Sequence, residues 1–482
     1  MIRRYRELSI QAKASIWYTV CDLLNKGITF LVIPVYIRLL TTEEYGQWSV
    51  FQSWRDILII FASLNLYCGV FTKKLVDNPE DRDRYTSCML GLNIAATAVF
   101  VLIYLAGRGW IEQALKMDTI TMALLLMYFI CFPAYQFWLT RQRVEYRYRK
   151  IVISTIVVTI LVPGISLYLL LACGMGARAV IYGYLIAMNL VGIVFAVLHF
   201  ARGKAWYDRE YWSYAFQFNL PLIPHYVSLI ALGQADRIMI REYCGDSDAG
   251  IYSFAYQIAL AVSVLISAVN GSRVPWTYER LRDKQYGKIK PVATLLCIGL
   301  GIVTVMIALL SPTVINILGT AEYRQAMYVI PVVTMATFLT FVYDLFCGIE
   351  FYYGATKYVM IASCTGAGLN ILLNAVFIPR YGFIAAAYTT LASYFVLMAM
   401  HWLFMNRVSR EQKITGKVYR VREIFLITGM TIAACFLSML TFRNSLLRFG
   451  LAGVLCAAAV WKREIFISAF GRMKERKPAG DE

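Results

Sequence analysis

The amino-acid sequence predicts an all-α polytopic membrane protein with 14 transmembrane helices. Of its 482 residues, 59% are hydrophobic and 16% are charged, whereas soluble chains carry about 25% charged residues. Eleven runs of at least nineteen residues lack Asp, Glu, Lys and Arg. Each run can cross roughly 30 Å of hydrocarbon as a helix. A transmembrane β-barrel would show alternating strands of about ten residues, so the helical class is favoured.

The eleven uncharged runs define eleven predicted spans: 86–107, 119–140, 151–177, 179–201, 211–235, 249–272, 291–321, 325–343, 358–379, 381–406 and 424–442. Three more spans contain charges, at 14–37, 46–71 and 445–461. The last of these allows Arg448 and Lys462 to reach opposite membrane interfaces. The first thirteen residues are basic and poor in apolar residues, which favours a retained first span over a cleaved signal peptide.

The distribution of Lys and Arg predicts the orientation of these spans. With the N-terminus inside, the cytoplasmic segments hold 35 of these residues and the outer loops hold 10. Cytoplasmic loops of membrane proteins are enriched in Lys and Arg, so both termini are expected in the cytoplasm. The formal charge of +18 therefore indicates the orientation of the spans. It also predicts a cytoplasmic face that suits anionic lipids. Binding of nucleic acid is not expected.

Several classes of chemistry are disfavoured. The 11 cysteines show no C-x-x-C spacing and are read as packing residues. The three histidines are too scattered for metal-ligand spacing, so no metal is expected. Gly-Lys pairs lack the spacing of a phosphate-binding loop. No long loop is present that would hold a soluble catalytic domain, so the protein is not expected to be an enzyme.

A weak internal repeat predicts two lobes. Gly46-Gln47-Trp48-Ser49 opens the second span and is similar to Gly250-Ile251-Tyr252-Ser253, which opens the eighth. Both motifs follow acidic outer loops, which indicates parallel repeats. The predicted organisation is an N-terminal lobe over 1–212, a C-terminal lobe over 213–406, and a region over 407–482 with a basic linker, two extra helices and a tail.

Three segments resemble Wzx-type polysaccharide flippases. NLPLIPHYVSLIALGQADRIMIREYCGDSDAGIYSFAYQIA (219–259) resembles their seventh and eighth helices, LVIPVYIRLLTTEEYGQWSVFQ (31–52) their first two, and IPRYGFIAAAYTT (378–390) their eleventh-to-twelfth turn. The segments are loose patterns at the scale of helices, and they occur in order over most of the chain. The resemblance implies the multidrug/oligosaccharidyl-lipid/polysaccharide exporter superfamily, with a V-shaped, two-lobe transporter that works by alternating access.

The resemblance also implies the substrate and the location. A flippase of this type moves an undecaprenyl-pyrophosphate-linked oligosaccharide across the bacterial cytoplasmic (inner) membrane for a surface polysaccharide such as O-antigen or capsule. Its expected partners are this lipid-linked oligosaccharide, anionic lipids and other polysaccharide assembly proteins. No cofactor is expected beyond a coupling ion, H⁺ or Na⁺. The alternatives are a lipid II-type flippase, a multidrug exporter and, least favoured, a membrane glycosyltransferase or polymerase.

Charges within the first two spans suggest a binding site. Asp22 and Lys26 are spaced to pair on one helix face, whereas Arg55 and Asp56 are adjacent and are expected to diverge by about 100°. Lys26 and Arg55 lie at similar predicted depth, so together they can meet one pyrophosphate. The alternative is that carboxylates neutralise both cations and the residues only hold helices together. A basic site also weighs against export of cationic drugs.

Other polar residues are candidates for gating, coupling or sugar binding. Asp236 and Arg237 can form an ion pair that closes an outer gate, or a static interfacial pair. Asp344 can bind a coupling ion or cap an interface. His225 follows Pro221 and Pro224, which predict a kink or hinge. His225 can contact sugar hydroxyls or can be an ordinary packed histidine.

Overall fold

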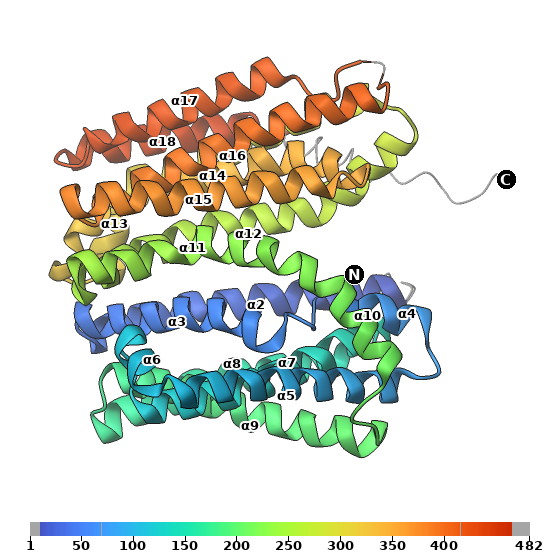
Figure 1. Cartoon of the computed structure of the whole chain (residues 1–482). Helices are drawn as coiled ribbons and strands as arrows, with labels where there is room; N and C mark the ends of the chain where they lie inside the picture. The colour runs from blue at the N-terminus through green and yellow to red at the C-terminus, as the bar shows by residue number, and fades with distance from the viewer. Residues whose placement is uncertain (1–9, 69, 415, 465–482) are drawn as a thin grey trace. The chain divides into compact units, whose positions relative to one another are not determined.

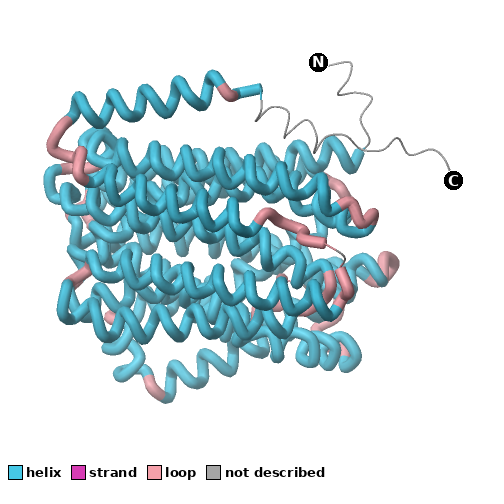
Figure 2. Tube along the Cα trace, turned by 90° about the horizontal axis from the view of Figure 1, so that it is seen from above, coloured by secondary structure: helices cyan, strands magenta, loops and turns pink. Residues whose placement is uncertain are grey.

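The computed structural model describes residues 10–68, 70–414 and 416–464, apart from the side chains at positions 11, 12, 15, 16, 19, 22, 23, 25, 26 and 29. Within these ranges every regular element is a helix, joined to the next by a short loop (Figure 2). The chain divides into two compact units between Gln234 and Ala235, and each unit is described separately.

The first unit holds helices from α2 to the first half of α11, coloured blue to green in Figure 1. They are α2 (Ile10–Leu39), α3 (Thr42–Ser63), α4 (Val70–Asp77), α5 (Arg82–Ala106), α6 (Arg108–Leu115), α7 (Thr119–Val144), α8 (Tyr148–Cys173), α9 (Ala177–Gly203), α10 (Arg209–Asn219), the 3₁₀ turn η1 (Leu220–Leu222) and α11 (Ile223–Cys244). Helix α9 packs against α5, α7 and α8, and α2 packs against α8.

The second unit continues from α11 to the last described helix. Its elements are α12 (Asp246–Arg282), α13 (Tyr286–Leu318), the 3₁₀ turn η2 (Ala321–Gln325), α14 (Ala326–Tyr352), α15 (Thr356–Tyr381), α16 (Ile384–Glu411), α17 (Val421–Met439) and α18 (Ser445–Trp461). Helix α14 contacts α12, α13, α15, α16 and α17, whereas α17 and α18 both pack against α13. Helix α14 is therefore the central helix of this unit, and its polar residues lie among neighbouring helices.

Eleven helical segments of the described chain are long and apolar enough to cross a membrane. They coincide one for one with the eleven uncharged runs, which confirms that part of the prediction. The three charged spans correspond to α2, α3 and α18, which fall outside this set. The all-helical membrane class is thus confirmed, and the total of 14 spans stays a prediction.

The predicted second span, 46–71, is not one continuous helix. Helix α3 ends at Ser63, and Leu64 and Asn65 adopt left-handed backbone conformations with φ of 50° and 51°. Such residues interrupt the helical ladder and leave carbonyl groups that need other partners. The amide of Asn219 supplies one, because its Nδ2 donates to the carbonyl oxygens of Leu64 and Asn65 at 3.0 and 3.1 Å.

A second interruption lies where the sequence predicts a hinge. The candidate span Arg209–Cys244 consists of α10, η1 and α11, with Pro221 inside the 3₁₀ turn and Pro224 in the first turn of α11. Proline removes a backbone donor and clashes with the preceding turn. The predicted kink is therefore confirmed, and Asn219 lies at its N-terminal side, where it contacts the break after α3.

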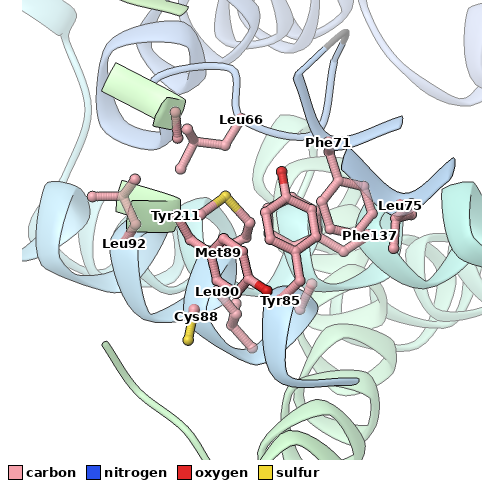
Figure 3. Close-up of a cluster of buried hydrophobic side chains, with 12 residues drawn as sticks. Leu66, Phe71, Leu75, Tyr85, Cys88, Met89, Leu90, Leu92, Phe137 and Tyr211 are labelled. Atoms are coloured by element: carbon pink, nitrogen blue, oxygen red, sulfur yellow. The ribbon is translucent and has the colours of Figure 1, made fainter. Parts of the chain in front are cut away.

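A cluster of buried hydrophobic side chains, several of them aromatic, lies in the first unit (Figure 3). The Phe71 ring stacks on Tyr85 with centroids 5.5 Å apart and lies 4.5 Å from the Phe137 ring. Tyr211 of α10 meets Tyr85 edge to face at 4.9 Å. Such pairs stabilise a core beyond the burial of apolar area. The cluster thus fixes α4, α5, α7 and α10 around the interrupted segments.

Candidate functional site

Arg55 forms the centre of a polar site in the first unit. It lies on α3 and is 8% exposed. Its Nε and Nη2 donate to Asp56 Oδ1 at 2.9 and 2.7 Å. The prediction that adjacent Arg55 and Asp56 diverge is therefore wrong for the ends of their side chains. Their Cα–Cβ bonds do point apart, but the long Arg side chain bends back to the carboxylate.

Two tyrosines cover the Arg55 guanidinium. Its carbon lies 4.6 Å from the ring centre of Tyr184 and 6.0 Å from that of Tyr128. The two hydroxyl groups lie 3.1 Å apart. Within the part of the chain that the structure describes, Arg55 Nη1 is buried and makes no hydrogen bond. Ring faces attract a cation without satisfying an N–H donor, so one nitrogen of Arg55 keeps an unused hydrogen-bonding capacity.

Gln234 completes the site from α11. Its Nε2 donates to Asp56 Oδ2 at 3.3 Å, and its Oε1 accepts from the hydroxyl of Ser53 at 3.2 Å. Tyr128, Tyr184 and Gln234 were not predicted from the sequence. Nothing in the local pattern singles them out, because the chain has 33 tyrosines and most of them suit membrane interfaces equally well.

Two predicted members of this site have no described side chain. The backbones of Asp22 and Lys26 belong to α2, but their side chains lie outside the described residues. Their pairing, and the shared cavity of Lys26 and Arg55, therefore stay predictions.

His225 is half-buried in the first unit, near the start of α11. Its ring lies 5.9 Å from that of Tyr226. Its Nδ1 is buried without a hydrogen bond to any described residue. A packed histidine usually has its ring nitrogens satisfied. Sugar binding by His225 stays a prediction.

Asp236 occupies a polar site in the second unit and is 1% exposed. Three neutral groups donate to its carboxylate: Tyr252 Oη at 2.6 Å, Asn374 Nδ2 at 2.6 Å and Thr390 Oγ1 at 2.7 Å. The donors come from α12, α15 and α16. Asn370 extends the network, since its Oδ1 accepts from Asn374 and its Nδ2 donates to Thr390.

Arg237 is also buried, at 5% exposure, and its guanidinium lies 4.4 Å from the centre of the Tyr256 ring. Asp236 lies two turns before the end of α11 at Cys244 and is held within the second unit. The gate role of Asp236 and Arg237 stays a prediction. The repeated motif at 46–49 and 250–253 did contain Tyr252, but no sequence pattern pointed to Asn374 or Thr390.

Asp344 joins a third polar chain on α14. Asn270 Nδ2 donates to Asp344 Oδ2 at 2.9 Å, and Arg273 Nε donates to Asn270 Oδ1 at 3.0 Å. Arg273 is 3% exposed, and its guanidinium lies 5.6 Å from the centre of the Phe341 ring. Asn270 thus links the carboxylate to a buried cation. Coupling and interface capping by Asp344 both stay predictions.

The sequence is similar to one protein family and to several known proteins. Residues 12–279 match the family described as polysaccharide biosynthesis protein. The chain is 26% identical over 362 residues to a Lsg locus protein of Haemophilus influenzae, over 73% of this chain and 87% of the relative. It is 24% identical over 457 residues to a membrane protein of Methanocaldococcus jannaschii, over 86% and 87% of the two chains.

Solved structures show the same fold. The lipid II flippase MurJ, in an inward closed conformation, aligns with a TM-score of 0.68 at 13% identity, over 94% of this chain and all of that chain. An inward-facing multidrug resistance transporter of the MATE family aligns with a TM-score of 0.60 at 13% identity, over 84% and 99%. The family match covers more than half of the sequence, so this chain belongs to the polysaccharide biosynthesis protein family and has the fold of flippases and transporters of the MOP superfamily.

Proposed function

We propose that this protein is a flippase for an undecaprenyl-pyrophosphate-linked oligosaccharide. It moves this lipid from the cytoplasmic to the outer leaflet of the bacterial cytoplasmic membrane, for a surface polysaccharide such as O-antigen or capsule. Both termini face the cytoplasm, and transport proceeds by alternating access without covalent chemistry. Membership of the polysaccharide biosynthesis family and the flippase fold support this class of function.

The main support for a pyrophosphate-linked substrate is the Arg55 Nη1 group, which makes no hydrogen bond to a described residue. A pyrophosphate cannot cross hydrocarbon bare, and an Arg guanidinium suits phosphate oxygens because its donors form a planar fork. Asp56 occupies Nε and Nη2, which holds the group in place, and Nη1 remains for a phosphate oxygen. Because Arg55 is 8% exposed in this conformation, binding requires another state in which Tyr128 and Tyr184 uncover it.

Coupling to an ion is assigned to Asp236. A fully buried carboxylate costs several kcal/mol unless it is compensated, and the three groups described as donating hydrogen bonds to Asp236 are all neutral. The oxygens of Asp236, Tyr252 and Thr390 are hard ligands, so the same site suits a proton on the carboxylate or Na⁺ among the oxygens. Binding or release of H⁺ or Na⁺ changes this charge, which favours one conformation over another.

Anionic lipids are proposed to bind the basic linker. A pocket of about 720 Å³ lies between the end of α16 and the start of α17, and its lining includes five basic residues: Arg410, Lys413, Lys417, Arg420 and Arg422. Glu423 is the only acidic residue of this lining. Basic pockets near the cytoplasmic surface attract anionic headgroups, which supports an anionic phospholipid as the partner here. Other polysaccharide assembly proteins stay expected partners.

Three other functions make different predictions. A lipid II flippase is favoured by the likeness to MurJ, which at 13% identity concerns the fold. A multidrug exporter is favoured by the likeness to MATE transporters, but the Arg55 site is cationic. A membrane glycosyltransferase or polymerase would normally need a sizeable extramembrane loop with carboxylates, and none was found in the sequence.

Translocation in proteoliposomes tests the proposal. Purified protein is reconstituted with one of three undecaprenyl lipids: a pyrophosphate-linked oligosaccharide, its monophosphate analogue, or lipid II. Leaflet exposure is followed with an enzyme that cannot enter the vesicle. We expect protein-dependent translocation of the pyrophosphate-linked oligosaccharide at least about tenfold faster than of the monophosphate. Translocation of lipid II alone would assign the alternative function, and translocation of none of the three lipids would refute both flippase hypotheses.

A further inference from the structure

A buried group of metal-ligand type lies in the second unit and shares no residue with the proposed transport sites. Cys347 and Glu350 are on α14 and His401 is on α16. The three residues are 4%, 0% and 1% exposed. One ligand atom from each, the Cys thiol sulfur, a Glu carboxylate oxygen and a His ring nitrogen, lies within 4.8 Å of the other two. We propose that Cys347, Glu350 and His401 form a Zn²⁺ site.

The helices α14 and α16 bring the side chains of Cys347, Glu350 and His401 close together. Cys347 and Glu350 are three residues apart, so they share a face of α14, and Glu350 on that face contacts His401 of α16. His401 Nδ1 lies 3.0 and 3.1 Å from the two Glu350 carboxylate oxygens. Two ligands on neighbouring corners of a tetrahedral Zn²⁺ lie about 3.3 to 3.6 Å apart, given metal bonds of about 2.0 to 2.3 Å. Small side-chain rotations would therefore close the site.

The ligand chemistry selects zinc over the hard cations. A thiolate and an imidazole are borderline-soft ligands, which suit Zn²⁺, whereas Mg²⁺ and Ca²⁺ require oxygen ligands. Charge balance favours the same ion. The thiolate of Cys347 and the carboxylate of Glu350 carry two negative charges, which Zn²⁺ neutralises while His401 stays neutral. Neutrality matters because an unbalanced charge in a lobe interior is costly.

The neighbouring ring holds the histidine in position. Tyr343, one turn before Cys347 on α14, stacks on the His401 ring with centroids 5.4 Å apart and planes 20° apart. A fixed ring direction lowers the cost of ordering a metal ligand. A bound Zn²⁺ would replace the proton between His401 and Glu350 and link α14 to α16 inside the second unit. This role is separate from transport and does not rest on the proposed function.

Metal binding to the purified full-length protein tests the site without any transport assay. After chelation and reloading, we expect one Zn²⁺ per chain. Co²⁺ in its place should give a thiolate-to-metal charge-transfer band. Cys347→Ala should abolish the band and the bound zinc. The matched control is Cys297→Ala, because Cys297 is equally buried in the second unit and is outside the ligand group. It should retain both signals.

A second variant covers the case in which Cys347→Ala fails to fold. Glu350→Gln keeps the size and the contact with His401 but removes the anionic ligand, so zinc affinity should fall at least about tenfold. At the same zinc concentration, zinc should also raise the unfolding temperature of the wild-type protein more than that of Glu350→Gln. Wild-type protein with no stoichiometric zinc and no charge-transfer band would overturn the site and leave His401 and Glu350 as a hydrogen-bonded pair.

Discussion

Arg55 donates two hydrogen bonds to one carboxylate oxygen of Asp56, the next residue in the chain, and its Nη1 stays buried without a hydrogen bond to a described residue. Neutralisation of the cation and binding of phosphate are therefore compatible roles. Asp56 compensates the charge while the site is closed. Because one guanidinium nitrogen is unused, the planar shape of the group should matter for phosphate binding in addition to its charge.

Replacement of Arg55 by Lys preserves the charge and removes the planar fork. We expect translocation per protein molecule to fall about tenfold or more, because a hydrogen bond to a charged group contributes about 1.5–3 kcal/mol. Arg55→Ala should abolish complementation while membrane abundance stays near normal. The matched control is Arg141→Lys, since Arg141 is similarly enclosed and pairs with Asp83 and Glu145. Loss of abundance in Arg55→Ala, or equal effects in both Lys variants, would indicate a folding role.

Asp236→Asn removes the charge of the second-unit site with little change in size. We expect gradient-driven transport to be lost while slow, downhill exchange between leaflets continues, because ion binding no longer biases the conformations. Translocation under imposed H⁺ and Na⁺ gradients measures this and identifies the ion. Asp344→Asn is the comparison, because Asp344 was the other predicted coupling residue. If only Asp344→Asn uncouples transport, coupling belongs to α14 and the assignment to Asp236 is wrong.

Asn219→Ala should destabilise the first unit. The substitution leaves the carbonyls of Leu64 and Asn65 without the amide donor that they share. An unsatisfied buried polar group costs about 1–3 kcal/mol. The unfolding temperature in detergent should fall accordingly. Gln217→Ala is the control on the same helix, because the described contact of its amide is a hydrogen bond to the exposed Ser213. Unchanged stability in Asn219→Ala would show that another group satisfies the break.

Asp118 gives a pH-dependent contribution to stability. It lies just before α7, where its side chain accepts from the backbone N–H of Thr121. Burial opposes its ionisation, but hydrogen bonds from Thr121 and Tyr182 and the charge of Arg178 outweigh it and hold the Asp118 pKa below its usual value. The stabilisation is therefore complete above the unfolded-state pKa of about 3.9 and is lost as pH falls through the lower folded-state pKa.

Asp118→Asn should isolate this effect, because Asn also caps helices but does not ionise. The free energy of unfolding should fall more steeply for the wild-type protein than for Asp118→Asn as the pH drops below about 4. At pH 7, Asp118→Ala should lose about 1 kcal/mol of stability. Unfolding measured across acid pH checks both expectations, and parallel acid profiles for wild type and Asp118→Asn would contradict the first.

Lys413→Glu with Lys417→Glu should weaken the binding of anionic phospholipid at the linker pocket. We expect phosphatidylglycerol to stabilise the wild-type protein more than phosphatidylcholine does, and this difference to shrink in the double variant. Thermal unfolding in the two lipids measures it. Lys284→Glu with Lys288→Glu changes the charge equally on another predicted cytoplasmic connection. An equal loss in both double variants would indicate a general surface-charge effect instead of a specific pocket.

The membrane class and most helix positions follow from the sequence alone. The eleven uncharged runs coincide with eleven helical segments that can cross a membrane, because hydrocarbon requires each spanning segment to be apolar and to satisfy its own backbone. Both requirements are local. The kink at Pro221 was predictable for the same reason, since proline acts on its own helix.

The contacts within the sites depend on residues far apart in the chain. Asn374 and Thr390 reach Asp236 across 138 and 154 residues, and His401 reaches Glu350 across 51. Sequence spacing does not show which helices pack together, so the scattered histidines gave no sign that His401 lies beside Glu350. Local hydropathy determines where a helix crosses the membrane. The residues that contact its buried polar side chains depend on how the helices pack together, and this packing is determined only by the tertiary structure.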